Sequence, residues 1–327
     1  MRILTGLMIV ALAVFSPLLA EAAPKVIKFS YIQNEGDQMD VVAKKAKAYI
    51  EEKTNGRYSI ELLCCQKMGS EEAMGTAIRT GTIQIMIVSA PGQLDPMMNM
   101  TGVPYTIKDV DHFYNVYEGP VGQEIADHFG KVAGFTPVYW LYRIHQMIFT
   151  TKPLTKPEDW AKFKIRAASN FAYTSQLEAM GAKVVPMPFP EVYMALKTGV
   201  IDGVQTVMDW FVSFKLYEVC KYAIDIQHDF SPVGVYFNNK FMASLSPEDK
   251  KIFIEAFSRQ KEENEKWVNA NYQRYYDKMI AEGVKVTKAS PEDIEKYKDM
   301  CQDFLRKNAK MCGGTEIMEK MFKAGGY

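Results

Sequence analysis

The sequence lacks the residue patterns that most enzymes and metal sites need. Its 327 residues include four histidines, and none of them forms an H-x-x-x-H or H-E-x-x-H pair. The patterns G-x-S-x-G, G-x-G-x-x-G and G-x-x-x-x-G-K-[ST] are also absent. The adjacent carboxylates Glu71 and Glu72 fall at a predicted helix start, where acidic side chains commonly complement the helix dipole. This inventory argues against an enzyme and indicates neither a metal nor a cofactor.

No block of like charge occurs either. The 39 lysines and arginines equal the 39 aspartates and glutamates, so the formal net charge is +0. Such a balance gives no support to binding of nucleic acid or of an anionic membrane surface. Hydrophobic residues make up 48%, which is ordinary for a soluble globular protein, and the length is sufficient for two domains. Internal repeats and low-complexity segments are absent as well.

Only one apolar run approaches the length of a membrane span, and it lies at the N-terminus. Arg2 precedes an almost wholly apolar stretch over residues 3–19, and residues 20–22 read Ala-Glu-Ala. A cationic start, an apolar run and an A-x-A site are typical of a secretory signal peptide. We therefore predict a signal peptide over residues 1–22 and a mature protein in the periplasm. An uncleaved anchor is the alternative, which the short run and Pro17 disfavour.

Cysteines are few and odd in number. The five are Cys64, Cys65, Cys220, Cys301 and Cys312. In an oxidising compartment, at least one thiol of an odd set is free or pairs between molecules. We expect Cys301 and Cys312 to form the bridge, because they bracket a short segment, and the adjacent Cys64 and Cys65 to face opposite ways. No C-x-x-C occurs, so neither zinc nor a thioredoxin-type couple is indicated.

The first third of the chain alternates strands and helices. Apolar periodicity predicts strands over residues 26–31, 57–63 and 83–88 and helices over residues 38–53 and 71–80. Asp37 is at the position that caps the first helix, and Gly81 stops the second. This alternation predicts a doubly wound α/β domain, whose ligands usually lie at the strand ends. Farther on, residues 247–281 contain no Pro or Gly and predict one long helix.

A short strand over residues 163–168 carries the strongest candidate for ligand binding. Its apolar and polar side chains alternate, which separates Arg166 from its apolar neighbours. A guanidinium is a planar fork of donors that matches a carboxylate with two parallel hydrogen bonds. Arg166 is therefore our first candidate for an anion anchor. A structural salt bridge with Asp202 or Glu191 is the alternative.

The forty residues that follow continue in the same α/β pattern. Residues 182–189 are extended, and their prolines at 186 and 188 prevent an ordinary strand from continuing. Pro190 suits the first turn of a helix over residues 191–198, which Gly199 ends. We expect a brief strand at residues 200–201 and a turn at residues 202–203. The pattern predicts parallel pairing.

At these residues the sequence resembles the DctP-type solute-binding proteins of TRAP transporters. The order and spacing of several short motifs both match. In the second domain they are Pro157-Glu158-Asp159, Lys164-Ile165-Arg166, Pro186-Met187-Pro188-Phe189, Glu191-Val192-Tyr193, Ala195-Leu196 and Thr198-Gly199-Val200-Ile201-Asp202-Gly203. Earlier pieces are Thr54-Asn55-Gly56-Arg57, Met68-Gly69-Ser70-Glu71 and Val103-Pro104-Tyr105. The resemblance extends over nearly the whole mature chain.

The resemblance implies an α/β, type II-like periplasmic binding protein with two domains, hinge strands and a long helix that spans both domains. It places domain I at residues 23–145 and 231–271, and domain II at residues 146–230 and 272–327. It also implies that the protein delivers its ligand to a small and a large integral-membrane subunit. We expect a monomer.

Matching the family residue by residue extends the candidate site beyond Arg166. Phe189 matches an aromatic that packs on the ligand, although it is equally suited to the core. Gln146 stands where sialic-acid-binding relatives carry a second arginine, and Thr206 stands where many relatives carry asparagine. Glu71 and Ser89 match first-domain positions that touch ligand in some relatives, but a helix start and a strand end explain them equally well.

Asp209 and Trp210 complete the candidate site. They lie just beyond the 202–203 turn, where they offer a polar group and a flat apolar wall, and Trp210 is equally suited to the core. With one predicted arginine, a single carboxylate is the simplest balanced ligand. Six aromatics around the site favour a bulky or aromatic monocarboxylate: Trp140, Tyr142, Phe171, Tyr173, Phe189 and Trp210.

Three other readings of the ligand and function stay open. An inward-facing Arg143 would restore a C4-dicarboxylate ligand. A keto acid or a sugar acid is a further candidate. The protein would instead be a sensor if it presents its ligand to a receptor without any transporter.

Overall fold

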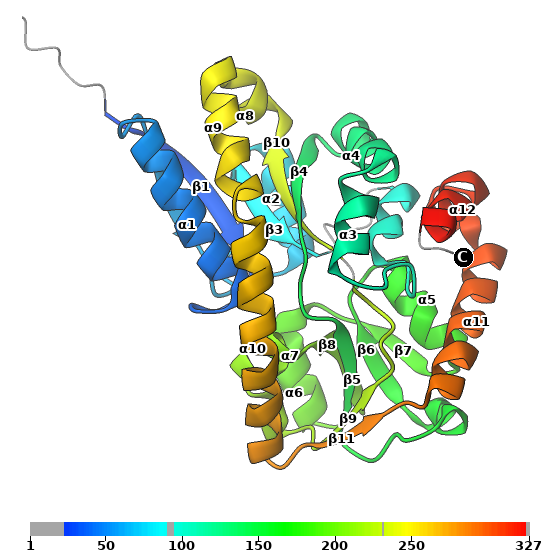
Figure 1. Cartoon of the computed structure of the whole chain (residues 1–327). Helices are drawn as coiled ribbons and strands as arrows, with labels where there is room; N and C mark the ends of the chain where they lie inside the picture. The colour runs from blue at the N-terminus through cyan, green and yellow to red at the C-terminus, as the bar shows by residue number, and fades with distance from the viewer. Residues whose placement is uncertain (1–22, 90–94, 231, 325–327) are drawn as a thin grey trace, which may run out of the picture.

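The computed structural model describes residues 23–89, 95–230 and 232–324, so the predicted signal peptide lies outside the described residues. The described residues form two β-sheets, each covered by helices (Figure 1). The first sheet has the strand order β2-β1-β3-β10-β4. Its strands are β1 (Lys25–Tyr31), β2 (Tyr58–Leu63), β3 (Ile85–Val88), β4 (Phe135–Leu141) and β10 (Val233–Asn238).

Apolar stripes attach the first sheet to its helices. In α1 (Gln38–Lys53), four apolar side chains are buried, those of Met39, Val42, Ala46 and Ile50. The remaining helices of this part are α2 (Glu71–Thr80), α3 (Val110–Tyr117), α4 (Pro120–Val132), α8 (Asn239–Ser244) and α9 (Pro247–Ser258), with the 3-10 helix η1 (Pro96–Gly102). Strand β1 pairs in parallel with β2 and β3, as the α/β alternation predicted.

The second sheet has the order β11-β9-β5-β8-β6-β7. Its strands are β5 (Gln146–Thr150), β6 (Lys164–Ala167), β7 (Lys183–Pro186), β8 (Gly203–Val207), β9 (Tyr222–Asp225) and β11 (Lys285–Lys288). Strand β6 pairs in parallel with β7 and β8, so the predicted parallel pairing is confirmed. Strand β5 runs antiparallel to β8 and β9.

The helices around the second sheet come from two parts of the chain. They are α5 (Phe171–Ala179), α6 (Val192–Lys197), α7 (Met208–Ser213) and α11 (Pro291–Lys307), with the 3-10 helices η2 (Pro157–Lys162), η3 (Phe189–Glu191) and η4 (Leu216–Glu218). After α11 come η5 (Ala309–Cys312) and α12 (Thr315–Ala324). Helix α11 packs on α5, whereas α12 packs on α4 beside the first sheet (Figure 1). The domain boundaries themselves stay a prediction.

Three connections join the two sheets. Residues 142–145 lead from β4 directly into β5, and the chain returns from β9 to β10. The third connection is α10 (Lys261–Ala281), which contacts α1 on one side and α7 on the other (Figure 1). Two extended crossings and one helix can act as a hinge between rigid bodies. Among the described residues, no helix combines the length and apolarity needed to cross a membrane.

The prediction of one long helix over residues 247–281 is wrong. The chain forms α9 and α10 instead, separated at Arg259 and Gln260. There the backbone N–H of Gln260 donates to the carbonyl of Phe257, and its side-chain amide donates to the carbonyl of Ala256. A tightened last turn of this kind ends α9 without Pro or Gly. Helix α10 alone spans both sheets.

Two smaller expectations near the site are also wrong. The brief strand at residues 200–201 does not form, and β8 begins at Gly203 instead. Buried Gln205 and Thr206 hid this strand from the apolar pattern. Asp37 is at the N-cap position before α1, but its carboxylate makes no capping hydrogen bond. It accepts one from the Tyr275 hydroxyl of α10 instead, at 3.3 Å.

The prediction of a disulfide bridge between Cys301 and Cys312 is wrong as well. The bonded pair is Cys64 and Cys65, whereas Cys220, Cys301 and Cys312 are free and buried. Cys301 packs among the apolar side chains of α11 and the second sheet, and Cys312 belongs to the core cluster that contains the first sheet. Because the two thiols lie in different hydrophobic clusters, their short sequence separation does not bring them together.

Candidate functional site

A small cavity lies between the two sheets. It measures about 30 Å³, which holds one or two water molecules. The lining residues are Glu71, Ser89, Arg143, Gln146, Arg166, Ala168, Tyr173, Gln205, Thr206, Val207 and Trp210. Six of our eight candidates are therefore brought together here. Because groups from both sheets close the cavity, an organic ligand enters only when the sheets move apart.

Arg166 reaches this cavity from strand β6. Its residue is 6% exposed, and its Nε donates to the carbonyl oxygen of Met187 at 2.8 Å. The guanidinium carbon lies 5.4 Å from the ring centroid of Phe189. Burial lowers the pKa of Arg166 to about 10, which still leaves it charged at neutral pH. The Nε bond fixes the side chain and leaves the Nη donors for a ligand.

Arg143 supplies a second cation to the same cavity. It comes from the crossing at residues 142–145 and is 6% exposed. Its Nη1 donates to the Ser89 hydroxyl at 2.8 Å, which connects the crossing to the end of β3. The inward orientation that the sequence left open is thus the one that the structure has.

Glu71 contributes a carboxylate to the cavity from the first domain. It begins α2, where Ser70 caps the helix by accepting from the backbone N–H of Ala73 at 3.2 Å. Its Oε1 accepts from the backbone N–H of Ser89 at 2.8 Å. Burial raises the pKa of Glu71 to about 7, although the Ser89 N–H and the charges of both arginines oppose this shift. Glu71 is therefore a proton-accepting group within the site.

Two strands supply the polar amides of the cavity. Gln146 in β5 stands opposite Val207 of β8, and its amide donates to Asp229 at 2.6 Å. In β8, Gln205 donates to the side chain of Gln176 at 2.9 Å, and Thr206 follows it into the cavity wall. The side-chain carbonyl oxygen of Gln205 has no hydrogen-bond partner among the described residues, so it can accept a hydrogen bond from a ligand hydroxyl.

The aromatic candidates divide into two groups. Tyr173 and Trp210 line the cavity, whereas Phe189 lies behind it, with its ring centroid 4.4 Å from that of Trp210. Trp140 packs in the first core instead, 5.4 Å from the Tyr117 ring. Phe189 does not line the cavity, but its ring packs against the Arg166 guanidinium. Fewer aromatic side chains therefore line the cavity than the sequence indicated.

Asp209 is not among the lining residues. Its Oδ2 accepts from the Nε2 of Gln33 at 2.6 Å, and Gln33 belongs to the loop that follows β1. Burial raises the pKa of Asp209 to about 6, and the nearby Arg143 charge opposes this shift. Asp209 therefore joins the two domains beside the cavity.

Sequence reasoning did not select Gln205, Ala168 or Val207 as site residues. Gln205 had a usable signal, because an amide in the wholly buried strand β8 needs a polar partner. Ala168 and Val207 have no chemistry of their own, so only the fold shows that they line the cavity.

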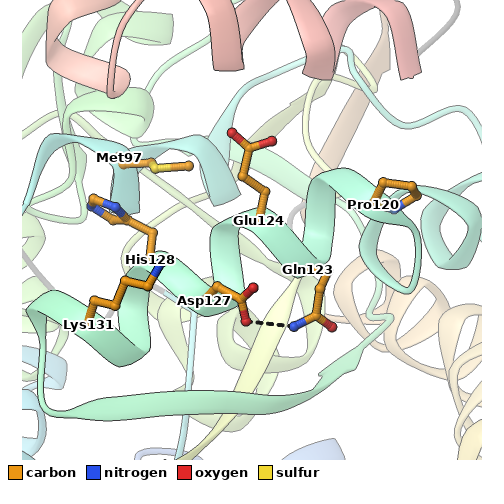
Figure 2. Close-up of a pocket in the computed structure, with 7 residues that line it drawn as sticks. All are labelled: Met97, Pro120, Gln123, Glu124, Asp127, His128 and Lys131. Atoms are coloured by element: carbon orange, nitrogen blue, oxygen red, sulfur yellow. Dashed lines mark hydrogen bonds between the residues drawn. The ribbon is translucent and has the colours of Figure 1, made fainter.

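A larger surface groove of about 490 Å³ lies on α4 (Figure 2). Several of its polar side chains already have partners: Gln123 donates to Asp127 at 2.8 Å, His128 pairs with Asp95 at 2.7 Å, and Glu124 accepts from Lys320 at 2.9 Å. Its lining residues in the described chain include no arginine. The smaller cavity between the sheets is therefore the better carboxylate site.

Two α/β domains with a hinge and a cationic cavity between them define a solute-binding protein. The chain matches the family model "Bacterial extracellular solute-binding protein, family 7" (DctP) over residues 29–311. It belongs to this family, whose members bind solutes for transporters rather than catalyse reactions.

Similar proteins agree with this assignment. The chain is 28% identical to the 2,3-diketo-L-gulonate-binding periplasmic protein YiaO of Escherichia coli, over 86% of each chain. It is also 28% identical to the C4-dicarboxylate-binding periplasmic protein DctP of Rhodobacter capsulatus, over 82% of this chain and 83% of the relative. Among solved structures, the sugar acid binding protein DctPAm of Advenella mimigardefordensis in complex with galactonate has a TM-score of 0.87 and 21% identity, covering 94% and 99% of the two chains.

Replacing Glu71 with glutamine is expected to strengthen binding of an organic acid at about pH 8. Glutamine keeps an acceptor for the Ser89 N–H but removes the negative charge that a ligand anion meets. The pKa of Glu71 is raised to about 7. Protonating Glu71 at pH 8, about one unit above this pKa, therefore lowers the affinity for the ligand about tenfold. Near pH 5 the two proteins should bind alike. Titration calorimetry at both pH values checks this. Equal affinities at pH 8 would mean that the charge of Glu71 does not act on the ligand.

Proposed function

We propose that this protein captures a monocarboxylic organic acid in the periplasm and delivers it to the two membrane subunits of a TRAP transporter. The observation that carries the proposal is the pair of buried arginines, Arg143 and Arg166, at a cavity between two hinged domains. The family assignment supports the class of function, and the periplasmic relatives support the compartment.

Charge balance favours one carboxylate on the ligand. Two arginines and two carboxyl groups, those of Glu71 and Asp209, interact in and beside the cavity. With both carboxyl groups ionised, the four side chains together have no net charge, and one added proton leaves them with a single positive charge. One ligand carboxylate then balances the site without a buried unpaired charge. A dicarboxylate needs protons on both acids, so we rank it second.

The polar lining favours a ligand with hydroxyl or carbonyl groups. The side chains of Gln146, Gln205 and Thr206 face the cavity, while two rings, those of Tyr173 and Trp210, supply its apolar surface. A hydroxylated acid, such as a sugar acid, uses both kinds of surface. An aromatic monoacid remains the second monocarboxylate candidate, because the two rings offer stacking surface.

Ligand binding and domain closure are coupled. The second domain presents Arg166 and the first presents Glu71 and Ser89, so a ligand contacts both sets only when the domains approach. A ligand favours the closed form only by its higher affinity for that form. The closed form is then the one that the membrane subunits receive.

Thermal unfolding of the mature protein against a panel of acids tests the proposal. The panel contains galactonate, 2,3-diketogulonate, benzoate, pyruvate and succinate. A ligand at a hundred times its dissociation constant adds about 2.7 kcal/mol to the free energy of unfolding, which raises the unfolding midpoint. We expect the largest shift with a hydroxylated monoacid. A shift with succinate alone would favour the dicarboxylate, and no shift with any acid would contradict an organic-acid function.

A further inference from the structure

A second set of buried polar groups joins the two domains beside the cavity. The loop after β1 reaches α7 through two hydrogen bonds. Gln33 donates to the Asp209 carboxylate at 2.6 Å, and Asn34 donates to the carbonyl of Ser213 at 3.4 Å. The other end of the Gln33 amide accepts from the backbone N–H of Met39 at 2.6 Å, which fixes it at the start of α1. Because the first two contacts join a loop of the first sheet to a helix of the second, we expect them to break when the domains move apart.

Asp37 lies in the same contact and has few partners. It is 5% exposed, and its Oδ1 accepts from the Tyr275 hydroxyl at 3.3 Å. Among the described residues, its Oδ2 has no hydrogen-bond partner. An ionised carboxylate that is buried with an unsatisfied oxygen is unfavourable, and a neutral carboxyl removes most of that cost.

The charged groups around the two carboxyls do not neutralise them. Asp37 faces the like charge of Asp209 from α7, and shares a groove of about 400 Å³ with Glu35 and, from α10, with Arg274 and Lys278. Within the described chain Asp37 makes no ion pair with either cation. Asp209 faces Arg143 from the crossing between the sheets. Asp37 and Asp209 are thus buried near one another, and each accepts a hydrogen bond from another part of the chain, from Tyr275 of α10 and from Gln33 of the loop after β1.

We propose that closing the two domains places one proton on the Asp37–Asp209 pair, which makes this pair a proton-dependent latch of the closed form. The latch uses groups that do not line the ligand cavity, and it deepens the proposed function by making ligand capture depend on pH. Gln33 and Asp209 hold the domains together, while the proton removes the repulsion that their approach creates.

The sign of the pH effect follows from the two forms. In the open form both carboxyls face water and have their ordinary pKa near 4. In the closed form, burial and then the charge of Asp209 raise the pKa of Asp37 to about 7, and burial raises the pKa of Asp209 to about 6. The closed form therefore binds more protons between about pH 4 and about pH 7. Closure is favoured at the lower end and is progressively lost as the pH rises through about 7.

Calorimetric titration with galactonate in buffers of different ionisation enthalpy measures this proton directly. The wild type should take up about one proton through the latch near pH 6, and its dissociation constant should rise by up to about tenfold per pH unit across the window. Asp37→Asn should lower the uptake by about one proton and bind more tightly than the wild type at about pH 8. Asp209→Asn is the second variant, and exposed Asp299→Asn is the matched control.

A ligand-free measurement separates this latch from the proposed function. X-ray scattering should give a smaller radius of gyration for the wild type at about pH 5 than at about pH 8, whereas Asp37→Asn should stay compact at both. Uptake that neither aspartate variant reduces would overturn the latch. If galactonate fails to bind, the scattering result decides alone: a radius that does not change with pH in the wild type overturns it.

Discussion

Replacing Arg166 with alanine is expected to abolish organic-acid binding while the protein stays folded. Arg166 is buried, and apart from the Met187 carbonyl bond its guanidinium is directed at the cavity. Removing the partner of a buried charge costs about 3–5 kcal/mol, or roughly a hundredfold to several thousandfold in affinity. Calorimetry with the best acid of the panel, together with circular dichroism for the fold, measures both halves of this expectation.

Two further variants show whether the loss of affinity comes from losing two parallel hydrogen bonds or from losing the positive charge alone. Arg166→Lys keeps the charge but cannot make two parallel hydrogen bonds, so we expect it to recover only part of the affinity. Arg143→Met removes the second cation and its bond to Ser89, and should weaken binding less. If Arg166→Ala retains wild-type affinity and Arg143→Met loses it, the anchor is Arg143 and the roles of the two residues are reversed.

Replacing Trp160 with alanine is expected to cause the largest loss of stability in the second domain. Trp160 is 0% exposed, and its Nε1 donates to the Tyr297 hydroxyl at 2.9 Å, which attaches η2 to α11. A buried Trp→Ala change costs about 3–5 kcal/mol through lost burial and the cavity it leaves. Urea unfolding followed by near-ultraviolet circular dichroism measures the change.

Tyr297→Phe is the matched control for that packing. It removes the hydroxyl that receives the Trp160 hydrogen bond and keeps the ring, whose centroid lies 5.7 Å from that of Trp160. We expect it to cost about 1–3 kcal/mol, since a buried indole N–H loses its acceptor. Equal losses from both variants would mean that the hydrogen bond, rather than the volume of the indole, attaches α11.

Local signals in the sequence were sufficient where a strong start or stop fixes the backbone. Helix α2 runs from Glu71 to Thr80 as expected, because Ser70 caps it and Gly81 adopts a left-handed conformation, with φ of 82°, that ends it. The break between α9 and α10 has no such residue. It depends on the side chain of Gln260, which donates to the Ala256 carbonyl and to the Val42 carbonyl of α1, and a tertiary contact is not visible in a local pattern.

The site shows the same division. Arg166 could be selected in advance, because strand alternation and motif resemblance both pointed to it. The orientation of Arg143 could not, because residues 142–145 are irregular and only the pairing of β4 and β5 with their sheets turns the guanidinium toward Ser89. Likewise, Asp37 looked like a helix cap, and its true partner, Tyr275, lies 238 residues away.

Native mass spectrometry of the protein purified from periplasm, side by side with Arg166→Ala, detects carboxylate capture directly. We expect the wild type to carry a small organic acid with one carboxylate and the variant prepared in the same way to carry none. A bound compound without an acid group, or equal loading of both proteins, would contradict carboxylate capture by Arg166.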